Sequence, residues 1–577
     1  MNIPRELASG LSEPVSRPEA GSKRVALAWG MVGLLAACGG TSKDGAGSPP
    51  GGDDGGATVV GTSLADAAGC GLVSQGTSGL ALKATLLVPG GPMDGELLID
   101  STGKITCVAA SCASTAGYSA ATQITCVNAV VSPGFVNAHD HTSYDFTPPI
   151  GHGTTRYQHR NEWRTGADGM TALPDPPTTT DPKVLASIEL RFLMSGVTSI
   201  VGAGGSPGLV RNLAAYSNPT WLEGLTGKTV NFDTFPLGDE NGVIIDSGCA
   251  YPKVDSVSYA NEDGIFAPHF AEGINLGAEN EIVCAATPTL GLLTSNTTVL
   301  HAVGTNAKDV AAIQAVGAKV VWAPRSNISL YGNTMPITEM KYAGVPVSLG
   351  TDWLPTGSMN MLRELSCADE MNSKYFGGAF DDPSLVAMAT STSATSMGFG
   401  NQIGTLAVGM QADLVVFATT AGQTAGWRTV IEAASEDVAL VLRGGTALYG
   451  DELLVQAVNG SACAAMDVCG LNKAVCLDVP GLALSDLQTA ASTTYPLFFC
   501  RGQIPTGEPT CIPYRDTYPS GSSATDQDGD GVPDTSDDCP AVFNPPRSMD
   551  VNDTQSDLDG DGFGDACDAK PLDATAH

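Results

Sequence analysis

The sequence predicts an α/β fold built around a (β/α)8 barrel. Between residues 131 and 402, short apolar runs typical of strands alternate with segments whose apolar residues recur at helical spacing. Polar residues suited to catalysis follow the ends of several runs, which is where the functional side chains of such barrels lie. Two β-rich segments, residues 77–130 and 403–455, flank this region.

The expected barrel strands are short apolar runs, which cover residues 130–138, 197–201, 229–234, 265–268, 298–300, 319–323 and 345–349. Helices are expected between and after them, among others over residues 183–194, 307–315 and 359–371. In the flanks, the runs at 81–88, 96–99 and 104–108 are divided by Pro-Gly-Gly and Thr-Gly turns, and residues 403–417 have a similar character.

The N-terminus has the pattern of an export signal. Lys23 and Arg24 precede a short apolar run that ends in Leu-Ala-Ala-Cys38, and this run is too short to span a bilayer. These four residues resemble a bacterial lipoprotein box, which implies removal of residues 1–37 and a lipid on Cys38. A cleaved signal without lipid is the alternative. Gly39 favours, by the same resemblance, the outer membrane or cell surface of a Gram-negative bacterium.

The composition of the chain argues against one class of partner, nucleic acid. The chain has 61 acidic and 28 basic residues, a net charge of −33, and no basic patch interleaved with aromatic residues, so nucleic acid is not an expected partner.

Residues 38–76 are rich in Gly, Ser, Pro and Asp and are predicted to be a flexible linker. If Cys38 carries lipid, fourteen of the 15 cysteines remain, an even number that indicates disulfides and an oxidising compartment.

A group of histidines indicates a metal site. His139 and His141 end the first barrel run, and residues i and i+2 of a strand share a face, so both imidazoles can reach one ion. The chain has only 7 histidines, and two more, His269 and His301, also end predicted strands. Asp352 ends another. Imidazole and carboxylate ligands suit Zn²⁺, and Fe²⁺ is the alternative.

These segments resemble the amidohydrolase superfamily, in particular the branch with cytosine and guanine deaminases and triazine hydrolases. The likeness covers roughly residues 77–455 and rests on residues 133–141, 269–272, 300–301, 322–327 and 350–352. It implies a TIM barrel over 131–402 and a composite split β-sandwich from 77–130 and 403–455. It also implies that His139, His141, His269 and Asp352 hold one metal ion. Binuclear members carry a carboxylated lysine on strand four, and residues 230–236 contain no lysine.

The resemblance also assigns catalytic roles. Asp352 accepts the proton of the attacking water, Glu272 shuttles a proton to the ring nitrogen and leaving group, and His301 orients the water or polarises the attacked carbon. The expected reaction is metal-dependent hydrolysis of a non-peptide carbon–nitrogen bond in a small molecule, most simply deamination of a heterocycle. Hydrolysis of a cyclic or linear amide and a non-catalytic cell-surface binding protein are the alternatives. A helix-capping Glu272 and a core His301 also stay open.

The loop at 144–166 is cationic and aromatic and follows the first strand. We expect it to overhang the barrel mouth and to contact an anionic or planar substrate, although a packed loop with internal ion pairs is equally compatible. The candidate substrate-binding residues are His159, Arg160, Trp163, Arg164 and, on the strand-seven segment, Asn327.

The C-terminus carries two aspartate-rich copies, which follow a cysteine-rich connector at 456–521. Alternating aspartates with glycine turns offer oxygen ligands to Ca²⁺, and residues 522–572 resemble thrombospondin type 3 repeats. A plain acidic tail is the alternative. Cys539 and Cys567 are a candidate disulfide pair, and the expected role of the tail is spacing or surface attachment. The predicted calcium ligands are Asp526, Asp528, Asp530, Asp534, Asp537, Asp557, Asp559, Asp561 and Asp565.

Overall fold

The computed structural model describes residues 62–65, 67–202, 204–205, 207–214, 219–254, 264–477 and 479–577. The predicted signal at 1–37, the predicted lipid site Cys38 and the linker residues up to 61 lie outside this part. Within it, no helix has the length and apolar character that crossing a membrane requires.

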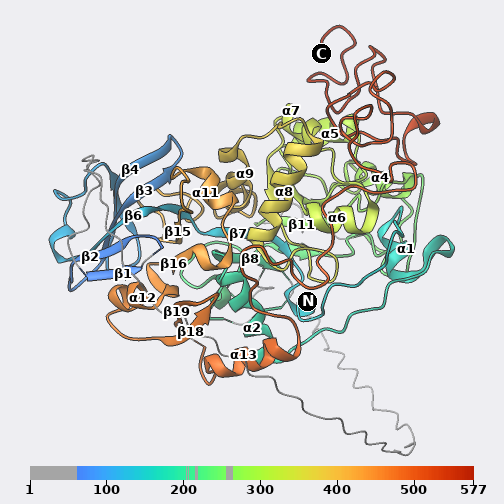
Figure 1. Cartoon of the computed structure of the whole chain (residues 1–577). Coiled ribbons are helices and arrows are strands. Elements are labelled where there is room, and N and C mark those ends of the chain that lie inside the picture. The colour runs from blue at the N-terminus through green and yellow to red at the C-terminus, as the bar shows by residue number, and fades with distance from the viewer. Residues whose placement is uncertain are drawn as a thin grey trace, which may run out of the picture. The chain divides into compact units, whose positions relative to one another are not determined.

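Parallel strands form a closed barrel (Figure 1). One parallel sheet has three strands and another has five. A bond from Val230 N to Leu213 O (2.7 Å) joins the two sheets on one side, and bonds from His141 N to Asp352 O (2.7 Å) and from Asp352 N to His139 O (3.0 Å) join them on the other. The predicted (β/α)8 barrel is therefore confirmed. Its strands are β7 (Phe135–Asp140), β8 (Val197–Gly202), β9 (Arg211–Asn212), β10 (Asn231–Asp233), β11 (Phe266–Phe270), β12 (Thr298–His301), β13 (Lys319–Trp322) and β14 (Val347–Leu349).

Helices follow the barrel strands, and several begin at an Asp or Asn whose side chain accepts a backbone N–H. Asn306 caps α5 in this way and Asn360 caps α8. The helices of the barrel region are α1 (Arg160–Thr165), α2 (Pro182–Leu193), α4 (Leu276–Ala285), α5 (Ala307–Val316), α6 (Pro324–Tyr331), α7 (Ile337–Tyr342), α8 (Met361–Tyr375), α9 (Asp382–Met388) and α10 (Ser391–Ser396).

The strand predicted at 130–138 is wrong in one respect, because the structure divides it between two sheets. Residues up to Pro133 belong to β6 (Thr122–Pro133) of the flanking sheet, and the barrel begins with β7 at Phe135. Gly134 lies at the division, where a Cβ would approach Thr198 Oγ1 to 2.6 Å. The two-residue strand β9 was not predicted, because it is too short to give an apolar pattern.

The flanking segments form one composite sheet of 11 strands. β15 of the second segment pairs with β6 of the first, and side chains such as Leu82, Ile124, Leu414 and Leu440 share one buried core. The other strands are β1 (Thr62–Ala65), β2 (Cys70–Ser74), β3 (Leu80–Val88), β4 (Gly91–Ile99), β5 (Ile105–Ala109), β15 (Leu414–Ala418), β16 (Val438–Arg443), β17 (Thr446–Asp451), β18 (Ala464–Val468) and β19 (Leu471–Val475). Helices α11 (Trp427–Ile431), α12 (Glu452–Asn459) and α13 (Leu484–Thr493) lie in and after the second segment.

This sheet includes residues from outside both predicted segments. β1 and β2 lie within the predicted linker at 38–76, so its last residues are not a flexible tether. β18 and β19 lie within the predicted connector at 456–521 and extend the sheet at β17. A disulfide between Cys70 and Cys126 fastens β2 to β6, which adds a covalent contact to a short strand.

The cysteine arithmetic is confirmed, because all fourteen cysteines of the described residues form seven disulfides. The candidate pair Cys539–Cys567 is one of them. Cys38, which lies outside this part of the chain, is the remaining cysteine.

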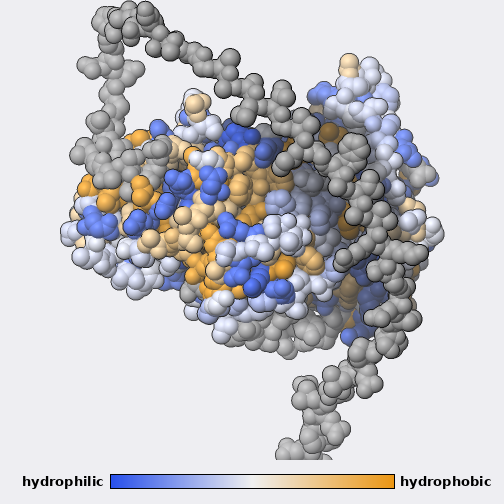
Figure 2. Space-filling view, turned by 60° about the horizontal axis from the view of Figure 1, so that its bottom comes forward, coloured by the Kyte–Doolittle hydropathy of each residue, from blue (hydrophilic) through white to orange (hydrophobic). Residues whose placement is uncertain are grey.

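The C-terminal tail, defined as the connector at 456–521 together with the repeats at 522–572, packs against the barrel. In the repeats, Arg547 Nη1 donates to the carbonyl oxygen of Thr305 (2.7 Å). The other contacts belong to the connector. Cys367 of α8 is bonded to Cys511. Arg515 Nη1 donates to the carbonyl oxygens of Tyr157 (3.1 Å) and Tyr331 (2.7 Å). Figure 1 shows the tail beside α4 and α5. On the face drawn in Figure 2, hydrophobic and hydrophilic residues are mixed, as on most folded proteins.

Candidate metal centre and pocket

Five potential ligands meet at the carboxyl ends of the barrel strands. His139 lies on β7 and His141 follows it, His269 lies on β11, His301 ends β12, and Asp352 follows β14. One ligand atom each of His139, His269 and His301 lies within 4.8 Å of the others, and the same holds for His139, His141 and Asp352. Since His139 belongs to both groups, the five side chains surround one small volume.

The distances within this centre suit a shared cation. Asp352 Oδ1 lies 3.1 Å from His139 Nε2 and 3.6 Å from His141 Nε2. The ring centroids of His139 lie 4.8 Å from those of His269 and 5.0 Å from those of His301. One nitrogen of each ring thus faces the ligand atoms of the neighbouring side chains, as expected of residues that bind the same metal ion.

Unsatisfied buried atoms support this interpretation. Both ring nitrogens of His139 and Nε2 of His269 are buried and have no partner in hydrogen-bond geometry among the described residues. His139 Nε2 is close to Asp352 Oδ1 but is not oriented to form a hydrogen bond with it. Buried polar atoms without partners are costly and rare, so unpartnered nitrogens on both His139 and His269 fit a site for a bound ion.

Burial also keeps the imidazoles neutral. It lowers the pKa of His141 and of His301 to about 3, and it lowers the pKa of His269 well below its ordinary value. Burial opposes ionisation of Asp352, but the neighbouring His139, His301 and His141 outweigh it and lower the pKa of this carboxyl. Near pH 7 the centre therefore offers imidazole lone pairs and a carboxylate, the protonation states that metal binding requires.

Hydrogen bonds from neighbouring strands orient the ligands. His269 Nδ1 donates to the carbonyl oxygen of Asp233 (2.8 Å), which leaves the lone pair of Nε2 free. Ser326 Oγ donates to Asp352 Oδ2 (2.5 Å). The predicted substrate contact Asn327 lies beside His301 instead, with 3.3 Å between Asn327 Nδ2 and His301 Nδ1.

The backbone at the strand ends is strained. His301 has a φ of 70°, Ala302 of 46°, Asp352 of 63° and Ala271 of 54°. Residues other than glycine rarely adopt this left-handed region, and each costs roughly 1–3 kcal/mol. The surrounding packing holds this conformation where the side chains of His301 and Asp352 turn into the barrel mouth.

The fourth barrel strand contributes an aromatic ring and no ligand. The ring of Phe232 on β10 lies 5.5 Å from His139, 5.3 Å from His141 and 5.4 Å from His269, measured between centroids. A phenyl ring cannot bridge two cations, so this wall of the centre fits one ion.

Glu272 lies beside the centre and is not a helix cap. Helix α4 is capped by Asn275, and Glu272 Oε1 instead accepts a hydrogen bond from Tyr331 Oη (2.8 Å). Its Oε2 lies 3.9 Å from His301 Nε2. Burial raises the pKa of Glu272 to about 8, although Arg160 opposes this shift. Glu272 therefore holds a proton at neutral pH, next to the candidate ligands.

A cavity of about 390 Å³ opens above the centre. Its floor includes His141, His269, His301, Asp352 and Glu272. Its walls include four aromatic residues and carry both charge signs. They are formed by Tyr144, Arg160, Trp163, Arg164, Leu173, Pro174, Asp175, Pro176, Thr234, Phe235 and Trp353.

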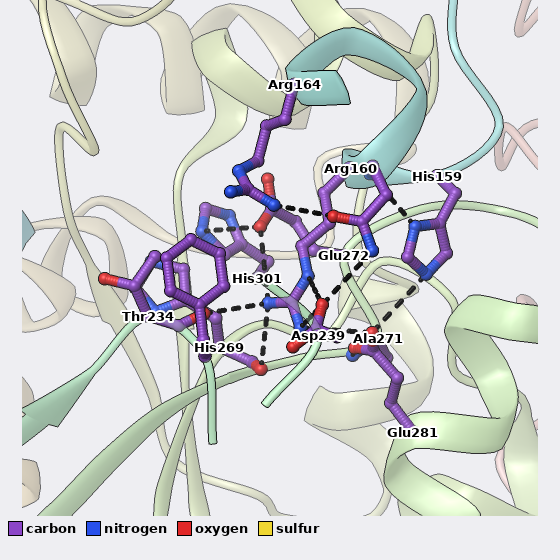
Figure 3. Close-up of polar contacts among 12 residues, drawn as sticks. His159, Arg160, Arg164, Thr234, Asp239, His269, Ala271, Glu272, Glu281 and His301 are labelled. Atoms are coloured by element: carbon purple, nitrogen blue, oxygen red, sulfur yellow. Dashed lines mark hydrogen bonds and ion pairs between the residues drawn. The ribbon is translucent and has the colours of Figure 1, made fainter. Parts of the chain in front are cut away.

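The candidate substrate contacts of the loop at 144–166 fall into two groups. Trp163 and Arg164 line the cavity. His159 faces Glu281, with 3.4 Å between Nε2 and Oε1, and its Nδ1 accepts the N–H of Asn161. Arg160 lines the cavity, but it is bound to Asp239 and Glu281, as Figure 3 shows. The loop therefore has both internal ion pairs and side chains directed at the cavity.

The two C-terminal copies have matching geometry. Carboxylate oxygens of Asp526, Asp528 and Asp530 lie within 4.8 Å of one another, and so do those of the second copy, Asp557, Asp559 and Asp561. In each copy the first aspartate accepts two glycine N–H groups. Asp534 and Asp565 fix the two loops through the N–H groups of Gln527 and Leu558.

The remaining predicted calcium ligand, Asp537, accepts hydrogen bonds at Oδ1 from Cys539 N (2.8 Å) and Gln555 (2.7 Å). Its Oδ2 and one oxygen each of Asp528 and Asp559 are buried without a hydrogen-bond partner among the described residues. Such oxygens leave room for a cation in both copies.

Comparison with known proteins gives relatives for part of the chain. A 5-methylthioadenosine/S-adenosylhomocysteine deaminase of Teredinibacter turnerae is 37% identical over 129 residues, which are 22% of this chain and 29% of that protein. The protein of the same name from Halobacterium salinarum is 35% identical over 130 residues, 22% of this chain and 30% of that protein. The matched part thus spans less than a third of these relatives.

Two solved structures are also similar. One is an adenosine deaminase from Xanthomonas campestris with bound zinc, at 18% identity and a TM-score of 0.47, covering 73% of this chain and 98% of that chain. The other is an atrazine chlorohydrolase from Arthrobacter aurescens TC1 complexed with zinc, at 17% identity and a TM-score of 0.48, covering 72% and 99%. By sequence, residues 257–448, which include His269, Glu272, His301 and Asp352, match the amidohydrolase family.

Proposed function

We propose that this protein is a metal-dependent hydrolase of a non-peptide carbon–nitrogen bond and that it deaminates a heterocyclic small molecule. One observation carries the proposal. The unpartnered nitrogens of His139 and His269 converge with Asp352 on the floor of a cavity that also contains a buried Glu272. The family match over 257–448 supports it.

The residues present fit one divalent ion. His139, His141, His269 and Asp352 would hold it, with His301 next to them, and neutral imidazoles with a carboxylate suit Zn²⁺ or Fe²⁺. When bound, such an ion supplies Lewis acidity, which makes water a usable nucleophile near neutral pH. The ring of Phe232 argues for one ion and therefore against the amide hydrolases that carry two.

The protein's own groups would manage the protons. Asp352 is ionised and can accept a proton from the attacking water. Glu272 is protonated and lines the cavity, so it can donate its proton to the ring nitrogen or the departing amine. Water adds its oxygen to the carbon, the carbon–nitrogen bond breaks, and the amine leaves as ammonia. Trp163 and Tyr331 hold Glu272 in place by successive hydrogen bonds of 2.9 and 2.8 Å.

The test is ammonia release by metal-loaded protein across purines, pyrimidines, pterins and aminotriazines, together with metal analysis. We expect turnover of at least one class with one metal per chain, and loss of at least a hundredfold in kcat in Asp352→Asn and Glu272→Gln. Glu339→Gln, which changes a buried carboxyl outside the cavity, is the matched control. A loaded protein that releases no ammonia would contradict the proposal and favour a binding protein, and two bound metals would favour an amide hydrolase.

We also propose that the protein is exported and lipid-anchored at the outer membrane or cell surface. The Leu-Ala-Ala-Cys38 pattern and the pairing of all fourteen other cysteines support this, because disulfides persist in oxidising compartments. Mass spectrometry of the mature N-terminus tests it. A lipid on Cys38 that disappears in Cys38→Ala is expected, whereas an unmodified N-terminus at another residue would contradict it.

The aspartate-rich copies are proposed to bind Ca²⁺ as thrombospondin type 3-like repeats. The support is the matching arrangement of the two clusters and the unpartnered buried oxygens of Asp528 and Asp559. Calcium titration of the full chain, with one ion expected per cluster, tests this proposal, and a protein that binds none would contradict it.

A further inference from the structure

Two arginines line the cavity, and the protein neutralises only one of them. Arg160 Nη2 lies 2.7 Å from Asp239 Oδ2 and 3.2 Å from Glu281 Oε1, and Arg160 is 1% exposed. Its charge is therefore balanced inside the fold. Arg164, one turn later on α1, has no aspartate or glutamate oxygen within ion-pair distance among the described residues.

Neutral groups hold Arg164 in place instead. Its Nη1 donates to Asn161 Oδ1 (2.6 Å), its Nη2 donates to the carbonyl oxygen of Glu240 (3.3 Å), and its guanidinium lies 4.2 Å from the centroid of the Phe235 ring. A guanidinium has five N–H donors, so these contacts leave others free. Figure 3 shows the side chain extending from α1 toward the side of Glu272 and His301.

A half-buried cation without a counter-charge is costly unless a ligand supplies one. Asp175 also lines the cavity, but it is exposed to solvent and lies beyond ion-pair distance from Arg164. Guanidinium groups bind carboxylates and phosphates through paired hydrogen bonds that are stronger than those between neutral groups. The guanidinium of Arg164, which has donors left and no acidic partner among the residues that the structure describes, therefore has the chemistry of an oxyanion-binding group.

The aromatic wall indicates what is attached to this oxyanion. The ring of Trp353 lies 5.5 Å from that of Trp163 and 5.8 Å from that of Tyr144, measured between centroids. These rings offer a surface for a planar substrate between the metal centre and Arg164.

We propose that Arg164 binds a carboxylate or phosphate of the substrate, so that this protein acts on heterocyclic amines that carry an anionic substituent. The inference rests on the proposed function, since it names the substrate class for the same cavity. Arg164 is a specificity-determining residue here and takes no part in breaking the carbon–nitrogen bond.

The first test compares matched neutral and anionic substrates. Metal-loaded protein is assayed for ammonia release with adenosine and adenosine 5′-monophosphate, and with pterin and pterin-6-carboxylate. For the accepted ring, we expect the anionic member to have a kcat/KM at least tenfold above its neutral partner. Arg164→Met should reduce this anionic-to-neutral ratio by roughly tenfold to a hundredfold, the range of a charge-assisted hydrogen bond, and Arg164→Lys by less. The two pairs distinguish a phosphate from a carboxylate.

Arg156→Met is the matched control. Arg156 belongs to the same loop, but it stacks on Tyr514 and lines a different hollow. Its removal deletes one positive charge without touching the cavity, so the ratio should stay at the wild-type value. A similar fall in both variants would mean a general charge effect and would overturn the proposal.

The second test is independent of turnover. Binding of the deaminated products inosine and inosine 5′-monophosphate is measured by calorimetry with wild type, Arg164→Met and Arg156→Met. If inosine 5′-monophosphate binds more tightly than inosine, and if only Arg164→Met loses this difference, the oxyanion site is supported. This holds even if no substrate is deaminated and the proposed function fails. Deamination with an anionic-to-neutral ratio that Arg164→Met does not change would keep the proposed function and overturn this inference.

Discussion

The candidate metal ligands depend on neighbours that hold them in one orientation, and Asp352 is the clearest case. Its Oδ1 faces the histidines while its Oδ2 accepts the hydroxyl of Ser326, which also contacts Thr356 Oγ1 at 2.8 Å. The serine thus decides which carboxylate oxygen is directed at the centre.

Ser326→Ala should weaken the metal centre without abolishing it. Loss of this hydrogen bond frees Asp352 to rotate, and changes to such supporting residues typically cost 10–100-fold in metal affinity or activity. Zinc affinity by chelator competition measures the effect. Ser329→Ala on the same helix is the control, because Ser329 contacts His152 and not the centre. Equal zinc affinity in Ser326→Ala and wild type would show that Asp352 needs no such support.

A second prediction at this scale concerns pH and stability. Burial raises the pKa of Glu339 to about 8, far above its usual value of 4.5. The folded protein therefore retains this proton where the unfolded chain has lost it, and the contribution of Glu339 to stability falls as pH rises from about 4.5 to about 8. The slope is at most about 1.4 kcal/mol per pH unit.

Glu339→Gln removes this titration. The melting temperature of the variant minus that of the wild type should therefore increase from pH 5 to pH 8. Scanning calorimetry of both proteins at each pH measures this difference. A difference in melting temperature that stays constant over this range would show that Glu339 ionises as freely in the folded protein as in the unfolded chain.

The sequence predicts some residues of the centre and not others. His139 and His141 share a strand face, and His269, His301 and Asp352 follow strand ends, so local pattern and family resemblance suffice for them. Ser326 and Tyr331 act through side-chain contacts with Asp352 and Glu272 that only the folded barrel creates. Ser326 lies in the segment 322–327 that contributes to the family resemblance, but neither its spacing nor that of Tyr331 indicates these contacts.

Among the elements, helix α6 links the cavity to the tail. Its last residue, Tyr331, donates to Glu272 from the side chain and accepts Arg515 of the tail at its carbonyl oxygen. Arg515 also contacts Tyr157 O, on the loop that leads to α1. The tail therefore braces the helix that positions Glu272 and the loop that carries Trp163 and Arg164.

Arg515→Met should loosen this brace. We expect unfolding to become easier by about 1–3 kcal/mol, because two buried carbonyl contacts are lost, and kcat to fall as Tyr331 becomes less ordered. Thermal melting and ammonia release measure both effects. Arg501→Met, which removes a more exposed tail arginine paired with Asp437, should change stability by less than about 1 kcal/mol. If Arg515→Met and Arg501→Met lower the melting temperature equally, the contacts of Arg515 do not stabilise the cavity.

Elements were predictable where their pattern is local. The six barrel strands predicted between residues 197 and 349 occur near their predicted positions because each is an apolar run bounded by turns. The run at 130–138 is continuous in sequence, yet tertiary pairing divides it: β6 pairs with β15 and β7 pairs with β8. Apolarity alone cannot indicate which sheet a residue joins.

For the whole molecule, long-range pairing decides where the folded part begins and ends. Residues 62–74 have the composition of a linker, but β2 pairs with β6 and the Cys70–Cys126 disulfide holds it there. The segment at 464–475 similarly joins the sheet through β17. Composition describes how a segment behaves alone, whereas partners distant in sequence determine these two boundaries.

The tail gives the last prediction, because its stability should depend on calcium. Burial, followed by Asp530, Asp537 and Asp526, raises the pKa of Asp528 to about 8, so without a cation the cluster becomes less stable as pH rises toward 8. A bound Ca²⁺ reverses this by favouring the ionised carboxylates. Calcium should therefore raise the melting temperature of the full chain more at pH 8 than at pH 5, with about 2.7 kcal/mol of stabilisation at a hundred times its Kd.

The Asp528→Asn/Asp559→Asn double variant, loaded with zinc like the wild type, should lose this response. Magnesium at the same concentration is the control, because Mg²⁺ needs a tighter octahedral arrangement than these loops offer and should stabilise less. Because Arg515 lies just before the first repeat, calcium that orders the repeat should also raise kcat in the wild type and leave the double variant unaffected. An equal calcium response in both proteins would place the cation elsewhere and leave the tail as a brace that needs no ion.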